Sequence, residues 1–292
     1  MTHASSVIGS TWIRRALAFA AFVILAICGS GCNKLKARDL LNKGVAAYKN
    51  AQYDAAIEDF KKAKELDPNL LNARLYLATA YASQYIPGAP SEQNMRLGNA
   101  AVQEFKEVLE MDPNNLSAVD GTGSILFQMA GTPFDPKKFE ESKSYHLKHI
   151  QLRPNDPEPY YWIGVIDWTL AYRSNGELRA AYNKDHVNKQ VRDDDPLPPA
   201  VRTEYASKYG PLVDEGITNL QKSIQVKPDY DDAMAYLNLM YRERADVQCD
   251  DPAARMADLK TADEWVDKNF ATKKAKAEKQ PGTGGIVMDQ NK

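Results

Sequence analysis

The sequence predicts an all-α protein, a solenoid of about five helix hairpins. Two patterns indicate this fold. Prolines stand directly after stretches of helical periodicity at four places, namely Pro68, Pro113, Pro154 and Pro228. Ten residues after each of these prolines comes a small or compact residue, namely Ala78, Gly123, Gly164 and Asn238. A pattern that returns in this way is typical of stacked repeats, which share one continuous core.

The composition bounds the function. Of the 292 residues, 43% are hydrophobic, which suffices for one large domain or a solenoid. Removing residues 1–31 takes away Arg14 and Arg15 and no acid, so that 35 basic residues face 39 acidic ones. This balance gives no reason to expect a nucleic-acid partner, which would require a clustered basic face. The three cysteines form no CxxC pattern, so we expect no cofactor and no redox, haem or zinc site.

Residues 1–31 have the features of a secretory signal. Arg14 and Arg15 precede thirteen uninterrupted apolar residues, Ala16–Cys28, and small residues follow. As a helix this apolar run would be about 20 Å long, whereas a bilayer core is about 30 Å thick. A cleaved signal is therefore favoured over a membrane-spanning anchor, although the charge-free stretch continues to Asn33 and leaves an uncleaved anchor open.

Cys32 completes a pattern that resembles the lipobox of bacterial lipoproteins. Ser30, Gly31 and Cys32 fit that pattern, whereas Gly29 stands where an aliphatic residue is usual. The resemblance implies a lipid on Cys32, with residues 32–36 as a tether; cleavage without lipidation is the alternative. It also implies a location in the cell envelope, facing the periplasm. Asn33 in place of Asp favours the outer membrane.

The first repeat, residues 37–70, carries seven residues at fixed offsets: Leu40, Gly44, Tyr53, Ala56, Phe60, Ala63 and Pro68. Gly and Ala allow two helices to approach closely, Phe60 fills the space between them, and Pro68 ends the second helix. This window resembles the tetratricopeptide repeat (TPR) family. The resemblance implies a right-handed superhelical solenoid of TPR-like hairpins that spans residues 37–270.

The later repeats keep the phase of the first but are degenerate. We expect them at 71–115, 116–156, 157–230 and 231–270, and the fourth contains an insertion at 173–210. The charged insertion, with Asp193–Asp195 and nearby prolines, is consistent with a long helix–loop–helix or with a mobile loop. Residues 271–292, rich in Lys and Gly, are expected to form a disordered tail.

The family resemblance also implies a concave groove lined by the first helix of each hairpin, which holds a segment of a partner protein. Carried over position by position, the groove of the five repeats consists of Arg38, Leu41, Val45, Tyr48 and Lys49; Asn72, Leu75, Thr79, Ala82 and Ser83; Ser117, Asp120, Ser124, Phe127 and Gln128; Glu158, Tyr161, Val165, Trp168 and Thr169; and Asp232, Ala235, Leu239, Arg242 and Glu243. Among these, we expect the partner contacts at Tyr48, Lys49, Phe127, Tyr161, Val165, Trp168 and Arg242. The basic and amide pattern of a TPR carboxylate clamp is not met, because Asp120 and Ser124 occupy its positions.

The fourth repeat is unusually aromatic. Tyr160, Tyr161, Trp162, Trp168 and Tyr172 occupy more of one helix than a single buried face can hold. Tyr and Trp are the usual anchors of binding hot spots, so an open aromatic binding patch is one interpretation. The other, which is slightly favoured, is that the insertion folds back and buries Trp168 and Tyr172 as core.

The sequence contains few candidates for catalysis or metal binding. His146 and His149 have a spacing that could bind a metal ion, but no third ligand stands near them. Two imidazoles half-buried in a hairpin, or one exposed and one packed, are therefore favoured over a metal site. Asp193–Asp195 lacks the EF-hand spacing and is expected to be a solvated turn. No phosphate-binding loop or nucleophile elbow occurs. We therefore expect no metal site and no enzymatic activity.

Together these features predict a non-enzymatic scaffold that is anchored in the bacterial cell envelope and binds envelope proteins in its groove. The alternative is a periplasmic carrier or sensor whose aromatic fourth repeat binds a small molecule or a glycan. An accessory subunit of an enzyme is a third possibility. Generic TPR motifs do not identify the partner.

Overall fold

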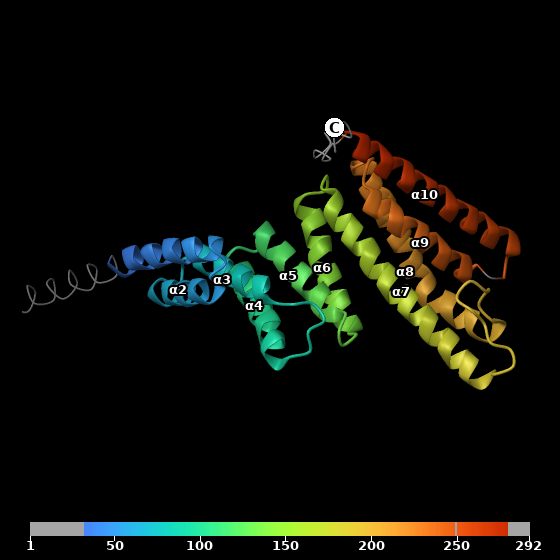
Figure 1. Cartoon of the computed structure of the whole chain (residues 1–292), viewed down its shortest axis with the longest axis horizontal. Coiled ribbons are helices and arrows are strands. Elements are labelled where there is room, and N and C mark those ends of the chain that lie inside the picture. The colour runs from blue at the N-terminus through green and yellow to red at the C-terminus, as the bar shows by residue number, and fades with distance from the viewer. Residues whose placement is uncertain (1–31, 249, 280–292) are drawn as a thin grey trace, which may run out of the picture. The chain divides into compact units, whose positions relative to one another are not determined.

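The computed structural model describes residues 32–248 and 250–279, and these are organised as α-helices joined by short turns and loops (Figure 1). The expected signal peptide, residues 1–31, lies outside the described residues, as does the end of the expected tail, residues 280–292. The chain divides into two compact units, one ending at Pro133 and the other beginning at Phe134. Each unit is described by itself.

The first unit consists of successive antiparallel helices. A helical segment at residues 32–49 is followed by α2 (Tyr53–Leu66), α3 (Leu71–Gln84), α4 (Glu92–Met111) and α5 (Leu116–Ala130). Each labelled helix packs on the next, and α3 also contacts α5. Alternate helices therefore form one layer and face the same side, as expected for stacked hairpins.

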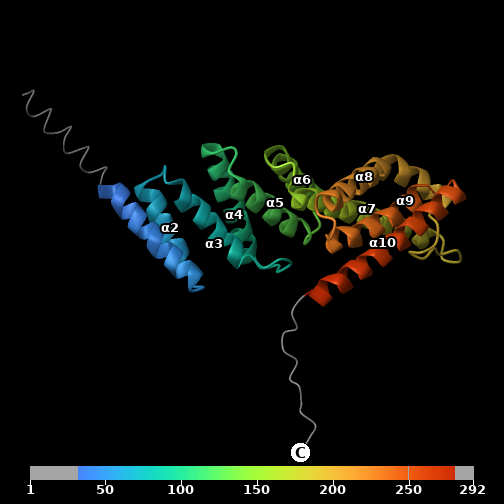
Figure 2. The ribbon, with the colours of Figure 1, turned by 90° about the horizontal axis from the view of Figure 1, so that it is seen from above.

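The second unit contains the long helices. It consists of α6 (Pro136–Leu152), α7 (Pro157–Asp185), α8 (Pro199–Val226), α9 (Asp231–Val247) and α10 (Pro252–Lys279). In Figures 1 and 2, α7, α8, α9 and α10 run side by side. Besides the contacts between consecutive helices, α7 packs directly on α9.

The prolines that mark the repeats end helices in the same way at four places. The residue before each proline is Asp67, Asp112, Arg153 or Lys227. At these residues φ lies between −142° and −128° and ψ between 79° and 89°, outside the helical region. A proline ring clashes with a preceding residue in the α conformation. The sequence thus sets the same bend at each of these turns.

Close approach of the paired helices depends on glycine. A Cβ atom on Gly44 would lie 2.5 Å from Cε1 of Phe60, and a Cβ atom on Gly164 would overlap the side chain of Leu220. Gly44 faces α2, and Gly164 on α7 faces α8. In both hairpins the side chain of the second helix fills the space that glycine leaves open. This confirms the role expected for the glycine of the first repeat.

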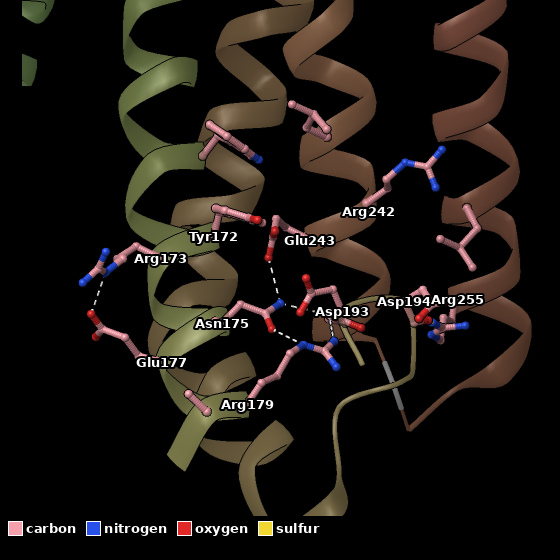
Figure 3. Close-up of a pocket in the computed structure, with 16 residues that line it drawn as sticks. Tyr172, Arg173, Asn175, Glu177, Arg179, Asp193, Asp194, Arg242, Glu243 and Arg255 are labelled. Atoms are coloured by element: carbon pink, nitrogen blue, oxygen red, sulfur yellow. Dashed lines mark hydrogen bonds and ion pairs between the residues drawn. The ribbon is translucent and has the colours of Figure 1, made fainter. Parts of the chain in front are cut away.

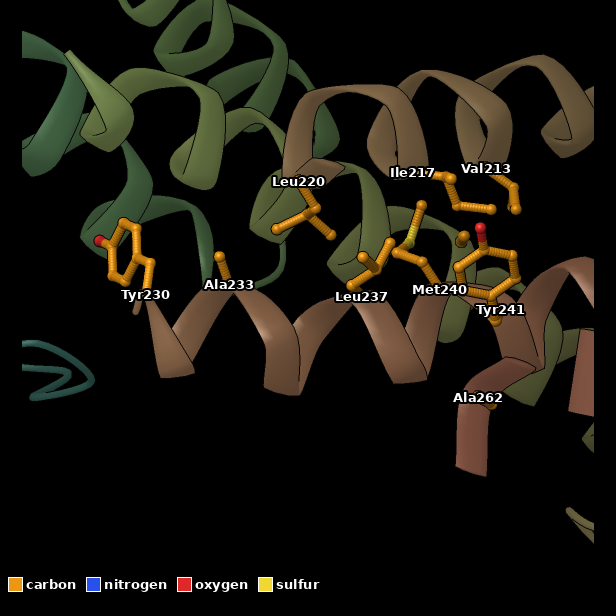
Figure 4. Close-up of a cluster of buried hydrophobic side chains, with 10 residues drawn as sticks. Val213, Ile217, Leu220, Tyr230, Ala233, Leu237, Met240, Tyr241 and Ala262 are labelled. Carbon is orange, nitrogen blue, oxygen red and sulfur yellow. The ribbon is translucent and has the colours of Figure 1, made fainter. Parts of the chain in front are cut away.

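The core of the second unit lies where α8 and α9 meet (Figure 4). Leu220, Leu237 and Met240 are completely buried there. Fully burying one such side chain contributes about 1.5–3 kcal/mol. Trp168, Tyr161 and Trp265 pack on the edge of this cluster, so the core also supports the aromatic side chains of α7.

Polar side chains of α6 and α7 are buried against each other, and the exposed Glu215 of α8 joins them. Nζ of Lys143 lies 2.8 Å from Oδ1 of Asp167 and 2.9 Å from Oε2 of Glu215. Burial raises the pKa of Asp167 to about 7. Next to this group, the ring of His146 stacks on Trp162, and burial together with the nearby His149 lowers the pKa of His146 to about 4. Both imidazoles are 5% exposed, so they lie deeper than the half-buried or partly exposed positions that the sequence predicts.

Three segments differ from expectation or decide between alternatives. Residues 32–36, expected as a tether, are helical. The insertion 173–210 continues α7 and α8 and closes with a loop at residues 186–198, so it has the helix–loop–helix form. The sequence predicts a disordered tail from residue 271, but α10 continues to Lys279, so the predicted start of the tail is too early. Its last turns are held by α9: Asn269 donates a hydrogen bond to the carbonyl oxygen of Asp231, and Lys276 pairs with the Asp231 carboxylate.

Among the described helices, none combines the length and the apolar character that a membrane span requires.

Candidate functional site

The second unit contains a pocket of about 760 Å³ (Figure 3). One wall is α7, the back is α9, and the first turns of α10 form the opposite wall. The loop 186–198 contributes Asp193 and Asp194 at the lower edge. The volume lies within the range of about 300–1,000 Å³ that is usual for ligand sites. The pocket exists because the insertion lengthens α7 beyond the usual hairpin.

Two aromatic side chains of α7 form the upper wall of the pocket. The ring of Trp168 stacks on that of Tyr172, with 5.0 Å between the ring centroids and 17° between the planes. Tyr236 contacts Trp168 edge-on at 5.3 Å. Tyr172 is 52% exposed and Trp168 is half-buried, so the insertion does not cover them as core. An accessible aromatic surface therefore remains on the wall.

The floor of the pocket is a buried polar network. Nδ2 of Asn175 donates hydrogen bonds of 2.9 Å to Oε2 of Glu243 and to Oδ2 of Asp246. Nη2 of Arg179 lies 2.6 Å from the same oxygen of Asp246. From α8, Tyr205 donates a 2.6 Å hydrogen bond to Oε2 of Glu243. All five residues are less than 9% exposed, so the network is part of the structure as well as of the pocket surface.

Arg179 also fixes the loop that borders the pocket. Its Nη1 donates hydrogen bonds to the carbonyl oxygens of Arg192, at 2.8 Å, and of Asp195, at 2.9 Å. Asn183 makes two further hydrogen bonds to the backbone of Val191. The loop is therefore bound to α7 through side chains that reach its backbone.

The charges around the pocket are mixed. Arg173 pairs with Glu177 at 2.7 Å on the exposed side of α7. Arg242 pairs at 2.8 Å with Asp263, which lies outside the pocket. Burial raises the pKa of Glu243, even though Tyr205 and Asn175 donate hydrogen bonds to it. The buried floor thus holds two carboxylates beside a single guanidinium.

The first unit has a smaller hollow of about 350 Å³. Six of its nine lining residues are groove positions that the sequence predicts, namely Thr79, Ala82, Ser83, Ser117, Ser124 and Gln128. They lie on α3 and α5, the first helices of their repeats. The lining is small and rich in hydroxyl groups, so this surface offers hydrogen bonds but neither charge nor a large apolar wall.

The seven expected contact residues occupy different environments. Trp168 and Arg242 meet in the large pocket. Tyr48 is half-buried and forms a 2.8 Å hydrogen bond with Ser83 at the edge of the small hollow, while Lys49 is exposed. Phe127 is half-buried on α5. The structure therefore leaves these five residues with at least part of their surface accessible.

Tyr161 and Val165 lie deeper than expected. Val165 is 2% exposed and has almost no surface for a partner. This expectation is corrected, because α7 packs on three other helices and none of its residues 161–171 is exposed. Tyr161 is half-buried between Tyr230 and Tyr236, at centroid distances of 5.1 and 5.7 Å, and burial raises its pKa. Tyr161 supports the aromatic wall indirectly, because Tyr236 contacts both Tyr161 and Trp168.

The sequence did not indicate the polar floor as a unit. Glu243 stands at a predicted groove position, but Asn175 and Arg179 lie in the charged insertion, and Asp246 lies one turn beyond the groove positions of α9. The only local signal is spacing, since Asn175 and Arg179 are four residues apart and Glu243 and Asp246 are three apart. Such pairs share one helix face. Polar pairs at this spacing more often lie on a solvent-exposed helix face, so the spacing did not predict a buried network.

Metal coordination finds little support in the part of the chain that is described. No group of three or more His, Cys, Asp or Glu side chains there is arranged to hold a metal ion.

Residues 37–70 match the family model described as tetratricopeptide repeat. No curated protein sequence matches the chain. Among solved structures, the chain is similar to the crystal structure of MamA protein, with a TM-score of 0.55 and 15% identity over 86% of this chain and 98% of that one. It is also similar to MamA 41-end from Desulfovibrio magneticus RS-1, with a TM-score of 0.52 and 17% identity over 82% of this chain and 96% of that one. At these identities the likeness shows the fold alone. The predicted fold class, an all-α solenoid of TPR-like hairpins, is confirmed.

Proposed function

We propose that this protein is a non-enzymatic scaffold of the bacterial cell envelope, which holds a segment of a partner protein in the pocket between α7, α9 and α10. The observation that carries the proposal is the accessible pair Trp168 and Tyr172 beside a pocket of about 760 Å³. Aromatic side chains at the centre of a hollow are typical anchors of protein–protein interfaces.

The TPR-like fold supports this proposal. Stacked hairpins create long surfaces that bind other proteins, and such repeats generally act as scaffolds rather than enzymes. The pocket is lined by α7 and α9, the first helices of two successive hairpins. This is the face on which the sequence predicts the partner groove.

Tethering is the second part of the proposal. Cys32 is exposed at the start of the described chain and directly follows the expected signal sequence. A lipid on this residue would attach the solenoid to a membrane while the pocket stays in the aqueous phase. The outer membrane is favoured by Asn33.

The volume of the pocket also favours a second candidate function, that of a carrier or sensor for a small molecule or glycan. A hollow of this size can enclose most of a drug-sized ligand. The two functions differ in what stays bound when the full chain is isolated. A carrier would bind its ligand without any second protein and change the fluorescence of Trp168.

The test is crosslinking in the native envelope followed by isolation of the chain. We expect the same partner proteins to be recovered with the wild type in every preparation, and at least about tenfold less of them with Tyr172→Ala, because truncating a hot-spot residue costs about 2 kcal/mol or more. Tyr172 is 52% exposed, so this change removes little core.

Phe270→Ala is the matched control. Phe270 is an exposed aromatic residue of α10 outside the pocket, with 68% of its surface accessible. Partner recovery should be unchanged in this variant. Equal recovery with wild type and Tyr172→Ala would show that the pocket does not bind the partner.

A further inference from the structure

The pocket is polarised, with an aromatic wall above and an excess of carboxylate at the floor and mouth. Its lining contains the carboxylates Glu177, Asp193, Asp194, Glu243 and Asp246 and the guanidinium groups Arg173, Arg179, Arg242 and Arg255. The balance of charge available to a ligand depends on which of these groups are already paired.

Three of the four guanidinium groups that line the pocket already form ion pairs. Arg173 pairs with Glu177, and Arg179 pairs with Asp246. Arg242 pairs with Asp263, a residue that does not line the pocket. These pairs leave Arg255 as the remaining guanidinium, and it donates a hydrogen bond of 3.4 Å to the carbonyl oxygen of Asp194.

Two carboxylates of the pocket, those of Glu243 and Asp193, can still bind a cationic ligand. Glu243 accepts both of its hydrogen bonds, from Asn175 and Tyr205, on the same oxygen, Oε2. Its other oxygen, Oε1, is therefore left for a donor that enters the pocket. Asp193 is exposed at the mouth and has no ion-pair partner among the described residues. The raised pKa of Glu243 is consistent with a buried carboxylate that lacks a full positive counter-charge.

The aromatic wall lies directly next to this carboxylate. Figure 3 shows Tyr172, on α7, pointing toward Glu243, on α9. A cation over the face of Trp or Tyr is attracted by the ring, and the attraction grows when water is excluded. The long apolar stem of a lysine or arginine side chain can lie on the rings while its charged end reaches an acid.

We propose that the pocket takes a basic side chain, lysine or arginine, from an extended segment of the partner protein, with its stem on Trp168 and Tyr172 and its cationic end at Glu243. Asp193 at the mouth attracts the approaching charge, whereas Asp194 already pairs with Arg192 at 3.5 Å. This inference rests on the proposed function and adds the chemical class of the bound residue.

The test uses the full-length chain and blocked heptapeptides of sequence Gly-Ser-Ala-X-Ala-Gly-Ser, in which X is Lys, norleucine or Glu. Binding is followed by the indole N–H resonance of Trp168, which is identified by its loss in Trp168→Phe. We expect the Lys peptide to bind roughly tenfold more tightly than the norleucine peptide, and the Glu peptide to bind more weakly than both. Binding of the Glu peptide that equals or exceeds binding of the Lys peptide would overturn the proposal.

Variants test whether Glu243, at the floor of the pocket, causes the preference for the Lys peptide over the norleucine peptide. Glu243→Gln keeps the shape of the side chain and an oxygen that accepts from Tyr205 and Asn175, and it should remove most of the preference for Lys over norleucine. Asp193→Asn, at an exposed position, should reduce that preference by about twofold. Glu204→Gln, an exposed residue of α8 outside the pocket, makes the same change in net charge and should leave it intact. An unchanged preference in both Glu243→Gln and Asp193→Asn would contradict the inference.

The outcome can be separated from that of the proposed function. If crosslinked partners are lost in Tyr172→Ala while no peptide shows a preference for Lys, the scaffold function stands and only the basic side chain is wrong. If the Lys peptide binds but no partner protein is recovered, the pocket recognises a cation and the scaffold function fails.

Discussion

At the scale of single residues, burial decides the behaviour of the titratable groups of this protein. His146 is 5% exposed between α6 and α7, and its ring stacks on Trp162. Removing an imidazole from water disfavours its charged form, and the neighbouring His149 adds repulsion. The pKa of His146 is therefore lowered to about 4, whereas in the unfolded chain it returns to about 6.5.

This difference predicts a loss of stability in acid. Because the folded-state pKa is below the unfolded value, the unfolded chain binds the proton first as the pH falls from 6.5 toward 4. The contribution of His146 to the free energy of unfolding is fully present above pH 6.5. The free energy of unfolding should decrease by about 2 to 3 kcal/mol by pH 4.5. His146→Phe keeps a ring against Trp162 and removes the titration.

Urea unfolding at pH 7.0 and pH 4.5 measures this effect as the difference between the wild type and His146→Phe. Other groups titrate in both proteins and cancel in the comparison. An equal loss of stability in the two proteins would show that His146 is accessible to protons in the folded state.

Two glycines of α7 allow a matched test of packing. A Cβ atom on Gly164 would overlap Leu220, whereas a Cβ atom on Gly176 meets nothing within 4 Å. Gly164→Ala should therefore lower the free energy of unfolding by about 1 to 3 kcal/mol through overpacking. Gly176→Ala should raise it by up to about 1 kcal/mol, because alanine has the higher helix propensity.

Chemical denaturation of both variants provides the measurement, and circular dichroism checks that the helix content is retained. If Gly164→Ala were as stable as the wild type, the hairpin of α7 and α8 would be packed less closely than described.

At the scale of elements, the long hairpin of α7 and α8 is the feature that distinguishes this protein. Its extra turns extend past the core cluster, and they are held by a polar network instead of apolar packing alone. Arg179 contributes four of the hydrogen bonds, to Asn175, Asp246 and the carbonyl oxygens of two loop residues. A buried network of this kind stabilises only while every member has its partner.

Arg179→Met should therefore release the loop and weaken the second unit. The change leaves Glu243 and Asp246 buried without a cation, which costs about 3 to 5 kcal/mol when one member of a buried pair is removed. Hydrogen exchange of the amides at residues 186–198 should become faster. Arg173→Met, at an exposed position with one ion pair, is the control and should leave the exchange unchanged.

At the scale of the whole molecule, two hollows of different chemistry lie on the first helices of successive hairpins. The hollow of the first unit is lined by hydroxyl and small side chains, and that of the second by aromatic and charged ones. A scaffold built in this way can bind chemically different segments at separate places. The scaffold proposal also requires that the chain be attached to the envelope.

The attachment can be tested on the intact chain. We expect the wild type to fractionate with the membrane and to carry a lipid on Cys32, as detected by mass spectrometry of the N-terminal peptide. Cys32→Ser should abolish both the fractionation with the membrane and the lipid. Cys28→Ser should leave the fractionation and the lipid unchanged. If Cys32→Ser remained in the membrane and retained peptides from residues 1–31, an uncleaved anchor would replace the lipid.

The sequence by itself determined the repeat and its turns. Prolines end the helices at the same backbone angles, and Gly44 and Gly164 mark the close approaches, because these constraints act within a few residues of the chain or within one hairpin. It also placed Trp168 and Arg242 on the face where the pocket lies. Only the tertiary structure decided that Val165 is buried, that Tyr172 is exposed, and that Asn175, Arg179, Glu243 and Asp246 form one floor. These outcomes depend on how long α7 is and on which helices cover it, and residues about seventy positions apart meet only after the hairpins have packed.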